Sequence, residues 1–364
     1  MGSLPGCPAV YLLTDAGGAP VQLASTQHLR RLALSRLVDA DTPKRGKTDL
    51  AAIVRGLRWR PVCAPFEARW WYYRLARQLH PSGYRRLVSF GPSWFLNVDW
   101  TRHVPEIRVT QRVWCEPGEC VGSWATRREC QQALEGLWDL FDLCRYPEQV
   151  RKAPAGQRCA YAEMGRCDAP CDGSAPLDDY SARSRAAWRF VCGAIDEWTA
   201  AAETRMKAQA ANRSYERAGQ IKQQIAFARR WREKWSPRLQ RADELNCLLA
   251  VPVTRRRAWK LFAFRRGELR AGPMLSDRKL PVDGPRWLAA QVERPIAELD
   301  DIVRMEQTWL VAHFLRSSES ERALTKALPA WTVPGHLEAE WRAELAERRR
   351  KGAGLQQPFP ENIA

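Results

Sequence analysis

Four cysteines lie within one segment of the chain that contains few apolar residues. Cys144, Cys159, Cys167 and Cys171 lie among Pro, Gly and Arg residues, which favour loops. Four thiolates suit either a tetrahedral zinc ion or an iron–sulfur cluster. Only the last pair comes close to the Cys-x2–4-Cys spacing of zinc sites. The long first gap and Pro170 favour a loop wrapped around a larger cluster, and free thiols are the alternative.

The charge and the length of the chain limit the classes of protein to which it can belong. A chain of 364 residues predicts several domains. A net charge of +17 and a pI near 9.7 are typical of nucleic-acid binders, although a merely soluble basic protein is the alternative. The sequence contains no apolar run long enough for a transmembrane helix and no signal peptide. With 11 cysteines, these features predict a cytoplasmic protein that uses thiols for metal rather than for disulfides.

Several ordered motifs point to one family. Residues 9–13 and 21–23 predict a β-hairpin, and residues 28–37 predict a basic helix. A second helix is expected around residues 67–79, and the cysteine segment closes with Gly165-Arg-Cys-Asp-Ala-Pro-Cys. This order resembles the UvrC subunit of bacterial excinuclease, which begins with a GIY-YIG nuclease domain. The resemblance implies that the four cysteines hold a four-iron–four-sulfur cluster, with zinc as the alternative.

The resemblance also indicates where nuclease chemistry would lie, and there this sequence departs from the family. The family uses a tyrosine on each of the first two strands, an arginine on the first helix and a metal-binding glutamate on a later helix. The corresponding positions hold Tyr11, Gln22, Leu32 and Tyr72. An amide is not a base near neutral pH, and magnesium prefers carboxylate oxygens. We therefore expect no incision at this site. The alternative is an active metal-dependent endonuclease with a rearranged site around Tyr11, Arg31 and Glu67.

Basic residues near the N-terminus are the candidate DNA contacts. They are Arg30, Arg31, Lys44, Arg45 and Lys47. Residues 39–65 are either a DNA-facing loop or a solvated basic insertion. Trp70 and Trp71 lie close to arginines and are candidates for stacking on bases. Contacts would be mostly to phosphates and therefore sensitive to salt.

Residues 203–225 resemble the UVR motif shared by UvrB and UvrC. The positions that match the motif or form one apolar stripe along the helix are Ala211, Tyr215, Glu216, Ala218, Ile221 and Ile225. The apolar members recur at helical spacing. They either pack on the neighbouring helix of the same chain or pair with a like hairpin of a UvrB-like partner. Lys222-Gln223 replaces the Arg-Asp pair of the motif.

These observations predict an α+β multidomain protein. The expected domains are a degenerate GIY-YIG-like α/β domain (1–105), a Cys-rich iron–sulfur segment (106–176), a helical UVR-like hairpin (177–242) and a partial RNase H-like region (243–364). The last region resembles the start of the UvrC carboxy-terminal domain, and the chain is expected to end before the catalytic aspartates of that domain. The leading hypothesis is a UvrC-like DNA-binding protein of excision repair or DNA processing. A redox or scaffolding iron–sulfur protein is a further alternative.

Overall fold

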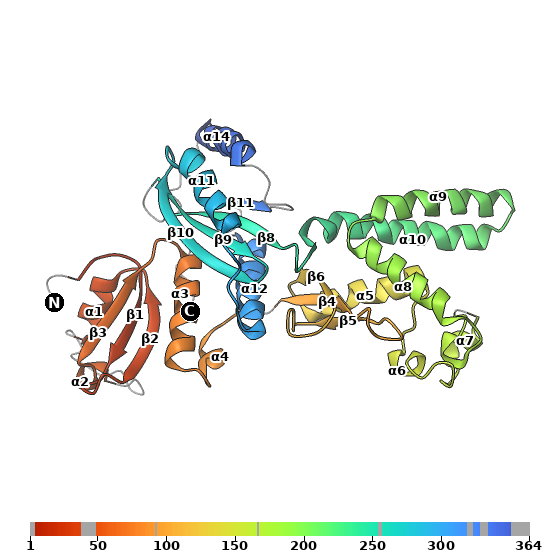
Figure 1. The fold of residues 1–364 in the computed structure, drawn as a ribbon, viewed down its shortest axis with the longest axis horizontal. Coiled ribbons are helices and arrows are strands. Elements are labelled where there is room, and N and C mark those ends of the chain that lie inside the picture. The colour runs from red at the N-terminus through yellow and green to blue at the C-terminus, as the bar shows by residue number, and fades with distance from the viewer. Residues whose placement is uncertain are drawn as a thin grey trace.

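The computed structural model describes residues 4–37, 49–91, 93–165, 167–253, 257–318, 323–327 and 334–350. Figure 1 shows an elongated molecule with three lobes in a row. The N-terminal lobe (within residues 4–62) lies at one end, and the cysteine lobe (within residues 93–244) lies at the other. The C-terminal lobe (within residues 245–350) lies between them, so the order in space differs from the order in sequence.

The N-terminal lobe is a three-stranded antiparallel sheet with helices. Its elements are β1 (Ala9–Thr14), β2 (Pro20–Thr26), α1 (Leu29–Leu37), α2 (Leu50–Ile53) and β3 (Gly56–Pro61), with strand order β2-β1-β3. The Asp15 carboxylate accepts the Ala19 N–H at 2.8 Å and closes the hairpin turn. Alternate residues of β1 face α1, so that Tyr11 and Leu13 pack against Leu29. The predicted hairpin and basic helix are confirmed.

Two helices connect this lobe to the C-terminal lobe. They are α3 (Pro65–Leu79) and α4 (Tyr84–Leu87). The ring of Phe66 on α3 lies 4.9 Å from that of Phe262 and 4.6 Å from that of Phe314, both in the C-terminal lobe. Trp70 and Tyr73 belong to the same buried cluster. The apolar face of α3 is therefore buried mainly against residues that follow it by about two hundred positions.

The C-terminal lobe is a four-stranded sheet with helices on both faces. Its elements are β8 (Asn246–Pro252), β9 (Ala258–Arg265), β10 (Glu268–Ser276), α11 (Leu280–Glu293), α12 (Asp301–Arg316), β11 (Leu324–Ala327) and α14 (Pro334–Arg350). All pairings are antiparallel in the order β10-β9-β8-β11. Leu249 and Val251 face the α3 and α12 side, whereas Leu248 and Ala250 face α11 and α14. Burial on both faces explains the almost uninterrupted apolar run of β8.

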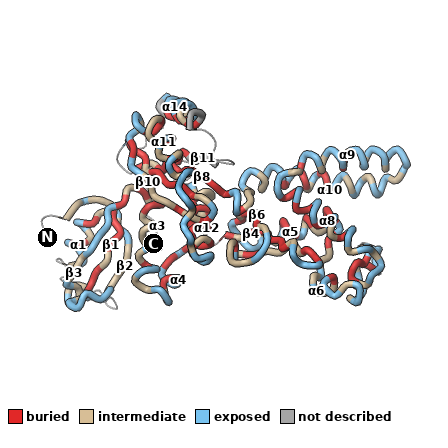
Figure 2. The backbone as a smooth tube through the Cα atoms, viewed as in Figure 1, coloured by how far each residue is buried: buried red, intermediate tan, exposed pale blue. Residues whose placement is uncertain are grey.

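The cysteine lobe combines a small sheet with a helical region. Its elements are β4 (Trp94–Val98), β5 (Ile107–Thr110), β6 (Glu119–Trp124), α5 (Arg127–Phe141), α6 (Pro147–Val150), α7 (Ala160–Glu163), the 3-10 turn η1 (Pro170–Asp172), α8 (Leu177–Val191), α9 (Ile195–Ala211), α10 (Tyr215–Lys234), the 3-10 turn η2 (Ser236–Arg238) and β7 (Gln240–Arg241). The sheet order is β5-β4-β6-β7, so the expected boundary at residue 105 falls between two paired strands. Figure 2 shows buried residues around α5 and α8 and an exposed far end of the α9–α10 hairpin.

Helix α12 contacts both neighbours of the C-terminal lobe. Trp114, in the loop between β5 and β6, donates its indole N–H to Thr308 at 2.9 Å. Trp309 donates its indole N–H to the Gln111 carbonyl at 3.1 Å. On the other side, the buried carboxylate of Glu306 faces α3 and α4. One helix therefore positions the cysteine lobe relative to the N-terminal part of the chain.

The observed fold is a mixed α/β structure with several cores, as the sequence predicts at that level. In the described residues, no helix is long and apolar enough to cross a bilayer.

Candidate functional site

The four cysteines lie on the loops and short helices that join α5 to α8. Helix α5 ends at Phe141, and its C-cap residue Asp142 adopts a left-handed conformation with φ of 50° before the chain reaches Cys144. Cys159 occupies the N-cap position of α7 without a capping hydrogen bond from its side chain, and Cys171 lies in η1. Cys171 is buried in the lobe core, whereas Cys144 and Cys167 are partly buried against it.

Backbone contacts bring the two ends of the segment together. The Gly156 N–H donates to the Cys171 carbonyl at 2.8 Å, and the Cys171 thiol donates to the Gln157 carbonyl at 3.5 Å. A Cβ on Gly156 would meet the Gln149 and Cys171 carbonyl oxygens, so only glycine allows this approach. The Cys144 thiol donates to the Tyr146 carbonyl at 3.3 Å.

The thiols interact electrostatically with one another. Burial raises the pKa of the Cys144 thiol to about 11, and Cys167, Cys171 and Cys159 add to the increase because thiolates repel. Burial raises the pKa of Cys171 too, with contributions from Asp172, Cys167 and Cys159. Among the described residues, however, no three His, Cys, Asp or Glu side chains lie close enough together to hold a metal ion. The donor chemistry fits a soft metal centre, but the thiols would have to move closer to ligate one.

The four expected GIY-YIG positions fall on both sides of the N-terminal sheet. Tyr11 is 1% exposed, and burial raises the pKa of its phenol, which the charge of Arg36 partly offsets. Arg36 also donates to the Gln22 amide oxygen at 3.3 Å. Leu32 packs into the lobe core, and Tyr72 lies partly buried against the C-terminal lobe cluster.

Arg36 lies beside Gln22 and Tyr11 but was not among the residues predicted for this site. It follows Leu32 by four residues, which places both on one side of α1. That spacing was the available signal for an arginine beside Tyr11 and Gln22.

Glu67, the carboxylate of the rearranged site, is already paired. It is 4% exposed, accepts the Cys63 N–H at 2.7 Å and lies 3.4 Å from the Lys260 ammonium. Both oxygens therefore have partners within the protein. A carboxylate in this state ties α3 to β9 rather than presenting ligands to solvent.

Arg30 and Arg31 are exposed on α1 and line an open depression with Gly6, His28, Leu34 and Ser35. The other three predicted DNA contacts, Lys44, Arg45 and Lys47, lie outside the described residues. Trp70 is buried in the C-terminal lobe cluster, so it cannot stack on bases.

The residues of the α9–α10 hairpin that were predicted to bind a partner differ in their exposure to solvent. Tyr215 is 69% exposed, and Glu216 beside it is also exposed. Ala218 and Ile221 are half-buried, and Ile225 is buried. The apolar stripe from Tyr215 to Ile225 is therefore packed within the chain at Ile225 and exposed to solvent at Tyr215.

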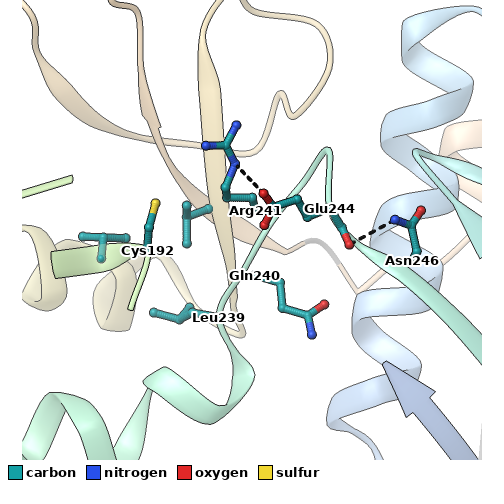
Figure 3. Close-up of a pocket in the computed structure, with 8 residues that line it drawn as sticks. Cys192, Leu239, Gln240, Arg241, Glu244 and Asn246 are labelled. Atoms are coloured by element: carbon teal, nitrogen blue, oxygen red, sulfur yellow. Dashed lines mark hydrogen bonds and ion pairs between the residues drawn. The ribbon is translucent and has the colours of Figure 1, made fainter. Parts of the chain in front are cut away.

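A pocket between β6, α8 and β7 was not expected from the sequence. Figure 3 shows Arg241 and Glu244 facing each other there, with Cys192 on the opposite side. The Arg241 guanidinium lies 3.1 Å from Glu119 and 2.9 Å from Asp243. Glu244 lies at 3.5 Å from the same guanidinium, so three carboxylates surround Arg241 and the arginine is not free to bind an anion.

Comparisons with known proteins agree with the family resemblance. Residues 93–190 match the model of the UvrC/Cho excinuclease middle domain. The chain is 23% identical over 225 residues to UvrABC system protein C of Geotalea daltonii, covering 62% of this chain and 36% of the relative. It is 26% identical over 219 residues to that of Trichlorobacter lovleyi, covering 59% and 35%. It is 22% identical over 271 residues to that of Thermobifida fusca, covering 74% and 41%.

The chain therefore spans well under half the length of these relatives. No solved structure matches it. The matched residues contain all four cysteines of the segment and the strands β4, β5 and β6, whereas β7 of the same sheet lies outside the match. The chain is a UvrC-like protein.

Proposed function

We propose that this chain is a DNA-binding protein of nucleotide-excision repair or DNA processing. The observation that carries the proposal is a UvrC-like middle domain at residues 93–190 in a chain with a net charge of +17. The relatives are named UvrABC system protein C. A basic surface attracts DNA phosphates and releases counterions, which gives affinity with little sequence selectivity.

We propose further that the N-terminal lobe does not incise DNA. Gln22, Leu32 and Tyr72 stand where the family has a tyrosine, an arginine and a glutamate. The rearranged alternative is disfavoured because its carboxylate, Glu67, is buried and paired with Lys260. With Glu67 held in this ion pair, the rearranged site has no carboxylate of its own to offer a divalent cation for metal-assisted hydrolysis.

The third part of the proposal is that Cys144, Cys159, Cys167 and Cys171 hold a four-iron–four-sulfur cluster, with zinc as the alternative. The support is a set of four thiols on one looped segment, in which burial and the neighbouring thiols raise the pKa of Cys144 and of Cys171. A bound cluster would take these sulfurs as thiolate ligands and cross-link the loops. We assign the protein to the cytoplasm because all 11 cysteines are free thiols, which fits a reducing compartment.

The open end of the α9–α10 hairpin is the proposed contact for a UvrB-like partner. Tyr215 presents a large exposed ring beside Glu216. Aromatic residues that are exposed in the free protein are typical anchors of interfaces. Ile225 is excluded from this role because it is buried in the chain's own hairpin.

DNA binding is tested by measuring the affinity of the full chain for labelled duplex and bubble DNA across salt concentrations. The affinity should fall linearly on a log–log plot between about 50 and 200 mM salt. An affinity that stays flat over this range would refute the proposal. Incubation of the same DNA with magnesium or manganese tests the absence of incision. Metal-dependent cleavage that is abolished by Tyr11→Phe or Glu67→Gln would support the nuclease alternative.

The cluster is tested by anaerobic purification and metal analysis. We expect a brown protein with about four irons per chain, as a cubane with four thiolate ligands requires. Cys167→Ser should lower the iron content, whereas Cys192→Ser should not, because Cys192 lies outside the segment. Zinc in place of iron would select the alternative cofactor. A metal-free protein that stays folded after loss of both Cys167 and Cys171 would contradict either metal.

A further inference from the structure

Three arginines lie on one face of the N-terminal lobe, where β3 meets α3. Arg58 and Arg60 pair with Leu12 and Val10 of β1, and residues two apart on a strand point to the same side. Arg74 lies on α3 and reaches the same region, because both Arg60 and Arg74 contact the indole of Trp71. Strand β3 is at the edge of the sheet, and all three arginines are exposed.

The indole rings of Trp70 and Trp71 contact two of these guanidinium groups. The Arg60 guanidinium carbon lies 3.4 Å from the centre of the Trp71 ring. That of Arg74 lies 4.8 Å from Trp71 and 4.9 Å from Trp70. Trp70 is 5% exposed and packs in the C-terminal lobe cluster. Stacking on a fixed ring restricts the guanidinium planes, so little entropy is lost when their N–H groups bind a ligand.

The positive charge of this site is not neutralised within the described part of the chain. There, no carboxylate forms an ion pair with Arg58, Arg60 or Arg74. The nearest candidate on α3 is Glu67, which precedes Trp71 by one helical turn. Its carboxylate is instead buried and paired with Lys260.

The two stacked arginines also repel each other. Partial burial lowers the pKa of Arg74, and the charge of Arg60 lowers it further. An anion between them would offset this repulsion. Because the Arg60 guanidinium covers the Trp71 ring, the site offers N–H donors there rather than an open ring for a base.

We propose that Arg58, Arg60 and Arg74 form a contact site for the phosphate backbone of nucleic acid. Guanidinium forks match phosphate oxygens in bidentate geometry. Arg58 and Arg60 are spaced about 7 Å apart along the strand, so the site is a short row of cations that fits a chain of phosphates better than a single anion. The inference rests on the proposed DNA binding and assigns part of that binding to a surface away from the cysteine segment.

The test compares two variants with equal loss of charge. In the site variant, Arg58, Arg60 and Arg74 are each changed to Gln. In the control, the same change is made at Arg217, Lys222 and Arg230, which are exposed on α10. The slope of log affinity against log salt for labelled duplex DNA should become shallower by about 2 to 3 in the site variant. It should stay near the wild-type slope in the control.

Two further measurements separate binding from folding. Arg58→Gln alone removes no stacking contact and should reduce the slope by about 0.9, with unchanged thermal unfolding. Arg60→Lys with Arg74→Lys keeps the charge but loses the planar fork. It should retain the slope and weaken the affinity.

Each outcome decides between the two proposals. If the wild type binds DNA and the site variant keeps the slope of the control, the inference is wrong and the proposed function stands. If the wild type does not bind DNA, both fail. Displacement of DNA by polyglutamate at equal charge concentration would identify a general anion surface and overturn the assignment to nucleic acid.

Discussion

The buried carboxylate of Glu306 on α12 joins that helix to both α3 and α4. Its side chain is 0% exposed. It accepts hydrogen bonds from the Tyr73 hydroxyl at 3.1 Å and from the Tyr84 hydroxyl at 2.8 Å, and the Arg85 Nε lies at 2.9 Å. Three donors from α3 and α4 therefore converge on one acceptor group of α12.

Replacing Glu306 with Gln tests this reasoning at nearly constant volume. A hydrogen bond to a charged group contributes about 1.5–3 kcal/mol, and the amide NH2 of Gln would face donors rather than acceptors. We expect Glu306→Gln to lower the free energy of unfolding by about 2–3 kcal/mol, within that range. Glu306→Ala should cost about 3–5 kcal/mol, because it leaves a cavity and deprives two buried hydroxyls of their acceptor.

The assay is urea unfolding followed by tryptophan fluorescence, with Glu298→Gln as the control. Glu298 is exposed on the same lobe, and its loss should change the free energy by less than about 0.5 kcal/mol. A double-mutant cycle with Tyr84→Phe should give a coupling energy of about 0.5–3 kcal/mol. If Glu306→Gln unfolds like the control, or if Tyr84→Phe costs the same with and without Glu306, the network does not hold these helices.

The remaining predictions concern packing, exposure and pH. Gly136→Ala should cost about 1–3 kcal/mol because its Cβ would meet a phenylalanine ring of α10, whereas Gly219→Ala, with open space around it, should be neutral or stabilising in thermal unfolding. Ile225 is 5% exposed and Tyr215 is 69% exposed. Ile225→Ala should therefore lower the free energy of unfolding by about 2–5 kcal/mol, whereas Tyr215→Ala should leave it nearly unchanged. Equal effects of the two changes would contradict the assigned packing. Burial, and secondarily the charge of Glu306, raises the pKa of the Tyr73 phenol, which in an unfolded chain is about 10. The phenol therefore stabilises the fold below about pH 10, and urea unfolding should show stability falling as the pH rises further; Tyr73→Phe should reduce this slope.

Patterns confined to short stretches were sufficient for much of the local structure. The short runs at residues 9–13 and 21–23 predicted the first hairpin, and helical spacing predicted α1 and the part of α10 that precedes Ile225. These features depend on contacts within about ten to twenty residues, and periodicity reports such contacts directly. The cysteine motif likewise carried the family resemblance, because its residues lie close together in sequence.

Features that join distant parts of the chain were not predictable in this way. Nothing near Glu67 in sequence indicates Lys260 as its partner, and nothing near Tyr73 indicates Glu306. Helix α3 was expected to belong to the N-terminal domain, yet its apolar face packs on a sheet almost two hundred residues later. An amphipathic pattern shows that a face will be buried, but the burial energy does not depend on which apolar surface covers it. Only the tertiary structure determines which apolar surface covers the helix. It also determines which carboxylates are paired, such as Glu67 and Glu306, and which arginines stay exposed.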